Sequence, residues 1–253
     1  MTSLSRILRS PTIAGLAGIV ALAAILEAAI NLGLVNAQIV ALPSAAVAAI
    51  PALETEWNVV EAFFVTFGMT AAATAIAIAL GVPLGFLLYR RNTLGEAYEG
   101  WLAAAFAAPL VLLYPLFLVI LGRTHFTLIV MGFIPGMIPI ILQTRQGLAT
   151  VSVTLLNVGR SYSLAPRQMF WKIMFPAAAP SVFNGIRIGV MYTLVNIVAI
   201  EYLTDFGGLG RLVSDMYFRY EIPGTYASIM FVVLVSVVFY WLLGRIERWL
   251  RPV

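Results

Sequence analysis

The stretch Gln143–Pro180, QTRQGLATVSVTLLNVGRSYSLAPRQMFWKIMFPAAAP, is the long segment of this chain that suits a bilayer interior least. It lies between two strongly apolar runs and has no acidic residue. Its basic residues are Arg145, Arg160, Arg167 and Lys172. A long basic loop kept on one side of a membrane is typical of a surface presented to a partner. We therefore interpret residues 143–176 as a docking loop between two membrane spans.

The composition excludes an ordinary soluble domain. The chain has 253 residues, of which 62% are hydrophobic and 10% charged, and its mean hydropathy is +0.98. In soluble domains about a quarter of all residues are charged. The chain has no cysteine and one histidine, His125, so it offers no disulfide, no thiolate metal site and no cysteine nucleophile. We predict neither a metal site nor a catalytic residue, and the net charge of +4 does not indicate nucleic-acid binding.

Apolar runs of the length needed to cross a bilayer, about 20 residues, recur along the sequence. They predict six spans in an all-α membrane protein that forms a single transmembrane domain over residues 1–253. The spans cover residues 12–35, 62–89, 100–122, 126–142, 177–200 and 222–244. Residues 36–61, 92–99 and 201–221 are interpreted as polar loops. The first run could also be a signal peptide, but its length favours a retained span.

The basic residues test this topology. Six spans place both termini and residues 143–176 on one side, and that side holds 12 of the 15 basic residues, including Arg6, Arg9 and Arg251. The three on the opposite side are Arg123, Arg211 and Arg219. Cytoplasmic loops are enriched in Lys and Arg. We therefore predict a multi-pass membrane protein with both termini and residues 143–176 in the cytoplasm.

Small residues and prolines inside the spans indicate how the helices pack. The pairs Gly81/Gly85, Gly132/Gly136 and Gly185/Gly189 each place two glycines on one helix face, which allows neighbouring backbones to approach closely. Prolines at 83, 109, 115, 135 and 139 free backbone carbonyls at membrane depth, which is tolerated against protein or a wet cavity. The central spans are therefore predicted to line a pathway.

Within the docking loop the pattern predicts two helices joined by a tight turn. Leu148, Val151, Leu155 and Val158 recur at helical spacing. Residues 163–165 break the pattern, Pro166 suits the first position of a second helix, and Pro176 is expected to end that helix. An interfacial hairpin lying on anionic headgroups would give the same pattern.

The loop resembles the cytoplasmic signature of the permease subunits of binding-protein-dependent ABC importers. That signature is Glu-Ala-Ala, three residues, Gly, nine residues, Ile, one residue and Leu-Pro. Ile173 and Pro176 match it, Phe175 replaces the Leu, Ser163 stands at the Gly, and residues 157–159 (Asn-Val-Gly) replace the triplet. Further short motifs resemble the nitrate/sulfonate/taurine branch of the family: Leu42-Pro43-Ser44, residues 81–85, Pro176–Arg187, Glu201 and Gly208-Leu209-Gly210.

The resemblance implies the type I importer permease fold and a set of partners. Two permeases, identical or related, would form the translocation pathway, and an external solute-binding protein would deliver the solute. Two separate ATP-binding subunits, which use ATP and Mg²⁺, would bind the loops. The chain itself is expected to bind no cofactor, because its one lysine, Lys172, does not lie in a phosphate-binding loop. The residues expected to contact the ATPase are Asn157, Gly159, Arg160, Ser161, Tyr162, Ser163, Leu164, Ala165 and Arg167.

A second set of residues is predicted to lie along the pathway or at its external mouth: Glu27, Tyr114, Met191, Tyr192, Asn196, Glu201 and Asp205. For Glu27 a buried hydrogen bond is an equal alternative. Two other classes of protein remain open, namely a non-ABC secondary transporter or substrate-capturing subunit, and a membrane enzyme. The solute stays open among sulfonates, nitrate, aromatic carboxylates and vitamin precursors.

Overall fold

The computed structural model describes the backbone of residues 11–250 and the side-chain surroundings of residues 13–245, and within this part of the chain it contains helices and no strand. Arg6, Arg9 and Arg251 lie outside the described residues. Five described helices are long and apolar enough to cross a membrane, or six if one bent pair counts as a single span. The prediction of an all-α multi-pass membrane protein is confirmed. The count of six spans and the side of the termini remain predictions.

The described chain forms two compact units. One unit comprises residues up to 60 together with residues 212–231. Its complete helices are α2 (Pro11–Asn31), α3 (Pro43–Ala48) and α4 (Ile50–Thr55), and it also holds the end of α12 (Gly208–Phe218) and the start of α13 (Ile222–Leu250). Helix α2 ends four residues before the predicted position 35, because Gly33 takes a φ of +73°.

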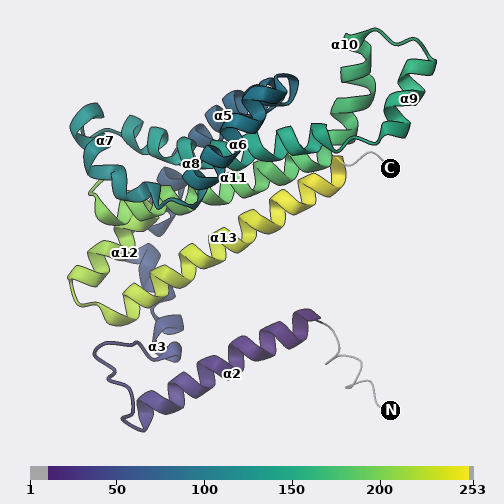
Figure 1. The fold of residues 1–253 in the computed structure, drawn as a ribbon. Helices are drawn as coiled ribbons and strands as arrows, with labels where there is room; N and C mark the ends of the chain where they lie inside the picture. Colours follow the sequence, from purple (N-terminus) through teal and green to yellow (C-terminus); the bar gives the residue numbers. More distant parts are fainter. Residues whose placement is uncertain (1–10, 251–253) are drawn as a thin grey trace, which may run out of the picture. The chain divides into compact units, whose positions relative to one another are not determined.

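The other unit holds most of the predicted spans. Its helices are α5 (Val59–Arg90), α6 (Asn92–Ala107), α7 (Tyr114–Leu121), α8 (His125–Ala149), α9 (Val153–Ser161), α10 (Pro166–Met169), α11 (Phe175–Leu203) and the later part of α13. Helices α8 and α11 run side by side through this unit (Figure 1). They contribute most of its buried side chains, among them Leu128, Ile140 and Ile197.

The glycine pairs predicted at helix contacts do lie there. A Cβ on Gly136 would lie 3.0 Å from the carbonyl oxygen of Gly189, and a Cβ on Gly185 would lie 3.0 Å from the carbonyl oxygen of Pro139. The Thr193 hydroxyl on α11 donates to the Gly132 carbonyl at 3.1 Å. On α5, Gly81 faces Ile140 of α8 in the same way. Close backbone approach therefore holds these helices together, as in other membrane bundles.

The predicted third span is broken in two. Helix α6 ends at Ala107, a 3₁₀ turn covers Leu110–Leu113, and α7 follows at an angle of 82° to α6. Ala108 is extended and Pro109 has no backbone N–H, so the helical hydrogen bonds stop there. The expectation that prolines interrupt residues 100–122 is confirmed at Pro109. Pro115 breaks nothing, because it lies in the first turn of α7.

Three segments expected to be loops are largely helical. Residues 92–99 form the first half of α6, residues 36–61 contain α3, α4 and the start of α5, and residues 201–221 contain the end of α11 and all of α12. These predictions were wrong because polarity was equated with loops. In α12, Leu209, Leu212, Val213 and Met216 are buried and recur at helical spacing, so that segment is an amphipathic helix.

Candidate functional site

The docking loop folds as two short helices joined by a turn, as predicted. Helix α9 begins after Ser152, whose hydroxyl accepts a hydrogen bond from the Thr154 N–H at 3.3 Å. Helix α10 begins at Pro166, and the Gln168 side chain accepts from the Ala165 N–H at 3.1 Å. The predicted stripe from Leu148 to Val158 is interrupted, since α8 ends at Ala149 and Leu148 is buried there. That correction follows from Ser152, which starts a new helix.

Ser163 forms the turn between α9 and α10. Its φ is +51°, in the left-handed region that glycine adopts freely and other residues adopt at a cost. Its N–H donates to the Arg160 carbonyl at 2.8 Å, and the Leu164 N–H donates to the Gly159 carbonyl at 3.1 Å. The position at which the resembling signature has glycine is therefore one where the backbone geometry favours glycine.

Gly159 sets how closely α9 approaches the second helix of the loop. It is buried, and a Cβ there would lie 2.6 Å from both the Ile173 Cδ1 and the Met169 Sδ. Ile173 is the residue that matches the isoleucine of the signature. The two signature positions therefore contact each other directly and hold the loop as one compact unit.

Exposed apolar side chains lie on α9 close to Gly159. Leu155, Val158 and Tyr162 recur at helical spacing, and the Tyr162 side chain is 78% exposed. Asn157 and Arg160 lie on the other side of the helix, joined by a hydrogen bond of 3.2 Å from the guanidinium to the amide oxygen. Arg167 is also exposed. The residues predicted to contact an ATPase therefore lie together in this loop, with Gly159 beneath its surface.

Helix α10 continues into α11 without a loop. The link is a π-helical segment, Phe170–Met174, and Figure 1 shows the chain changing direction between α10 and α11. Pro176 does not end a helix. It lies in the first turn of α11, where no backbone N–H is needed for the helix.

At the other end of α11, the Glu201 carboxylate is completely buried. It accepts hydrogen bonds from the Thr66 hydroxyl of α5 at 2.8 Å and from the Gly210 N–H at 3.1 Å. The Thr66 oxygen in turn accepts from the Leu209 N–H at 2.8 Å. Gly208 has a φ of +86°, and a Cβ there would overlap the carboxylate. The Gly-rich turn is thus folded around Glu201.

The other predicted pathway residues are spread over both units. Asp205 is exposed and pairs with Arg211 at 2.7 Å and with Arg123 at 3.5 Å. Tyr192 stacks near Phe106, with ring centroids 4.3 Å apart, and the Asn196 amide donates to the Tyr192 carbonyl. Tyr114 packs beside Leu128, Met131 and Ile200, and Met191 is half-buried. In its own unit, Glu27 accepts from the Ser44 N–H at 3.0 Å and from the Ser44 hydroxyl.

Sequence reasoning missed two sets of residues. Thr66 belongs to a Thr66/Thr70/Thr74 row at four-residue spacing on α5, a signal that was present in the sequence. Arg90 and Phe86 lie at the end of α5 and line a hollow shared with the docking loop. No periodicity in α5 or in the docking loop indicated that these two segments would meet.

The family of the chain follows from comparison with known proteins. Residues 77–252 match the profile of the family described as "Binding-protein-dependent transport system inner membrane component". The chain belongs to this family. It is therefore an ABC importer permease of the multi-pass inner-membrane type.

Several permeases are similar to this one. The nitrate import permease protein NrtB of Synechocystis sp. is 28% identical over 74% of this chain and 66% of its own length. The osmoprotectant import permease protein OsmW of Salmonella typhimurium is 29% identical over 73% of this chain and 87% of its own length. The chain thus spans about two thirds of the first of these relatives.

A solved structure shows the same fold. In the inward-facing MetNI methionine ABC transporter, one chain superposes with a TM-score of 0.68 at 21% identity, covering 78% of this permease and 98% of that chain. At this identity the likeness concerns the fold alone. It confirms the predicted type of permease fold.

Proposed function

We propose that this permease forms the translocation pathway of an ABC importer together with a second copy or a related permease. A separate external solute-binding protein delivers the solute, and two cytoplasmic ATP-binding subunits drive transport through residues 143–176. The chain itself carries the pathway and binds no nucleotide. The solute is a small anion or a vitamin-precursor-like molecule, in keeping with the nitrate permease among its relatives.

The observation that carries the proposal is the exposed face of α9. Leu155, Val158 and Tyr162 form an exposed apolar stripe, and Asn157 and Arg160 lie on the other side of the helix. Between Glu99 and Glu201 the sequence contains no acidic residue. An amphipathic helix that leaves its apolar side open fits the groove of a partner protein.

The break between α6 and α7 supports a shared pathway. Ala108 and Pro109 are exposed at a point where helical hydrogen bonding stops. Such backbone is tolerated at membrane depth where protein or a water-filled cavity covers it. A second permease, or the pathway itself, would provide that cover.

At the far end of α11, Glu201 shapes the external mouth without touching the solute. Its carboxylate is buried and holds the Gly-rich turn, whereas Asp205 is exposed beside Arg123 and Arg211. These charged side chains are available to a binding protein. Two basic residues next to Asp205 also reduce the repulsion that this acid would exert on an anion.

The test of the proposal is capture of the ATPase from the native membrane. The tagged chain should co-purify with an ATP-binding subunit whose hydrolysis rises when the cognate binding protein is added. Tyr162→Ala and Arg160→Glu should each reduce the recovered ATPase at least fivefold, a loss of about 1 kcal/mol or more, because they remove an exposed aromatic anchor and reverse a charge. Tyr98→Ala, an exposed tyrosine on α6, is the matched control and should leave recovery unchanged. Equal recovery with all three variants would contradict the proposed docking face.

Ser163 gives an independent prediction for the turn. Ser163→Gly should raise the stability of the turn by about 1 kcal/mol and keep or increase stimulated ATP hydrolysis, because glycine adopts a positive φ freely. Ser163→Val should lower the stimulated hydrolysis severalfold, because a β-branched residue disfavours this conformation. The rate of stimulated ATP hydrolysis is measured for both Ser163 variants in liposomes. A valine variant more active than the glycine variant would show that the turn geometry plays no part in coupling.

A further inference from the structure

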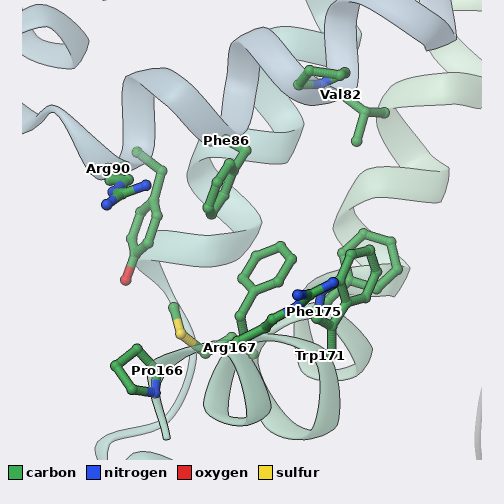
Figure 2. A pocket seen from close by; sticks show the side chains of 11 residues that line it. Val82, Phe86, Arg90, Pro166, Arg167, Trp171 and Phe175 are labelled. Carbon is green, nitrogen blue, oxygen red and sulfur yellow. The ribbon is translucent and has the colours of Figure 1, made fainter.

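A hollow of about 620 Å³ lies between the end of α5 and the segment Pro166–Phe175 of the docking loop (Figure 2). Its volume is in the range of small-molecule sites. Figure 2 shows Phe86 reaching from α5 toward the helix that carries Trp171 and Phe175, with Arg90 at one side of the hollow. The face of α9 proposed to meet the ATPase contributes none of its lining residues.

The interior of the hollow is apolar and aromatic. The rings of Phe86 and Phe170 lie 4.6 Å apart between centroids, and those of Trp171 and Phe175 lie 5.4 Å apart. Trp171 remains 57% exposed. Ala75 and Ala79 precede Val82 and Phe86 on the same face of α5 and are also exposed. The apolar surface therefore continues from the hollow along a helix that crosses the bilayer.

The polar residues of the hollow are cationic. Arg90 and Arg167 both line it and are exposed, and neither guanidinium forms an ion pair or hydrogen bond with another described residue. The nearest acidic residues along the chain are engaged elsewhere: Glu96 accepts from Asn92, and Glu99 pairs with Arg145. Two arginines beside an apolar hollow complement a ligand with a negative head and an apolar tail.

The position along α5 indicates where such a ligand comes from. The helix is uncharged from Ala62 to Tyr89 and ends at Arg90, so the hollow lies where the apolar span meets the polar surface. Tyr and Trp concentrate at this level of a membrane, and Tyr89 and Trp171 both line the hollow. The docking loop is predicted to lie on the cytoplasmic side. Basic pockets between transmembrane helices on that side of a membrane bind anionic lipid headgroups.

We propose that this hollow binds an anionic phospholipid of the surrounding leaflet. The phosphate-containing headgroup lies by Arg90 and Arg167, and an acyl chain enters the aromatic interior and continues along Ala75 and Ala79 of α5. The lipid would fill the space between α5 and the base of the docking loop. This inference does not depend on the solute, and of the residues expected to contact the ATPase only Arg167 lines the hollow.

Trp171 provides a direct readout of the lipid. A variant that keeps this tryptophan and carries Trp57→Phe, Trp101→Phe, Trp241→Phe and Trp249→Phe is reconstituted in phosphatidylcholine vesicles. Phosphatidylglycerol or phosphatidylcholine brominated on the acyl chain is then added at equal mole fractions. We expect the brominated phosphatidylglycerol to be enriched next to Trp171 about fivefold for each arginine. Arg90→Gln with Arg167→Gln should abolish this preference.

Two controls separate a site from general attraction to the membrane. Arg160→Gln removes a positive charge from α9, outside the hollow, and should keep the preference. A variant that keeps only Trp101, which is 76% exposed on α6, should show no preference. Equal quenching by both lipids, preference that survives the double arginine change, or no quenching by either lipid would each overturn the proposal. The last outcome would mean that protein covers the hollow.

A second measurement uses the unaltered chain. Native mass spectrometry of protein released from an equal mixture of phosphatidylglycerol and phosphatidylcholine should show a retained phosphatidylglycerol. The Arg90→Gln/Arg167→Gln variant should lose it. Retention by both proteins, or by neither, would contradict the site even if the single-tryptophan variant fails to fold.

Discussion

Glu201→Ala should lower the free energy of unfolding by about 3–5 kcal/mol. The carboxylate is fully buried and accepts hydrogen bonds from the Thr66 hydroxyl and the Gly210 N–H. Its removal leaves both donors buried without this acceptor and opens a cavity. Each unsatisfied buried donor costs about 1–3 kcal/mol. Reversible unfolding by sodium dodecyl sulfate in mixed micelles measures the change.

Two matched variants define the source of that effect. Asp205→Ala removes an acid four residues further on, whose side chain is 63% exposed and ion-paired, and should cost less than about 1 kcal/mol. Glu201→Gln keeps a carbonyl oxygen that can accept from the Gly210 N–H, so it should fall between the two. Equal losses for the two alanine variants would mean that the buried hydrogen bonds do not hold the turn.

Gly136→Val should destabilise the chain by about 3 kcal/mol or prevent its folding. A Cβ at Gly136 meets Thr193 and lies 3.0 Å from the backbone carbonyl oxygen of Gly189. A backbone atom cannot rotate away as a side chain can, so α8 and α11 would have to separate along their contact. The yield of monodisperse protein and its unfolding midpoint both report this.

The control is a glycine in a span without such a contact. Around Gly18 of α2, no described atom lies within 4 Å of an added Cβ, so Gly18→Val should change stability by less than about 0.5 kcal/mol. If Gly18→Val proved as harmful as Gly136→Val, loss of glycine in itself would be the cause, and close helix packing would not.

The spans and their glycine contacts were predictable because both depend on local pattern. An uncharged run such as residues 62–89 must become a helix in a bilayer, and it lies within α5. Likewise, glycines four residues apart share a helix face, which placed Gly136 and Gly189 at contacts. The extents of the polar helices were missed, because α12 and the start of α6 are too polar for a search based on hydropathy.

The docking loop was predictable for a different reason. Pro166 and the break at Ser163 are local signals, and the structure has a helix start and a turn at these positions. Tertiary pairing was not predictable in this way. Thr66 and Glu201 are 135 residues apart, and nothing in either segment specifies the other. The lipid hollow combines Phe86 with Trp171 for the same reason.

The π-helical segment Phe170–Met174 joins α10 of the docking loop to α11. In the proposed importer, a displacement of α9 by the ATPase would reach α11 through this segment as well as through α8. We expect the stiffness of the segment Phe170–Met174 to set how many ATP molecules are hydrolysed for each solute transported. If this segment were more flexible, the ATPase would hydrolyse ATP while α11 did not move and no solute crossed the membrane.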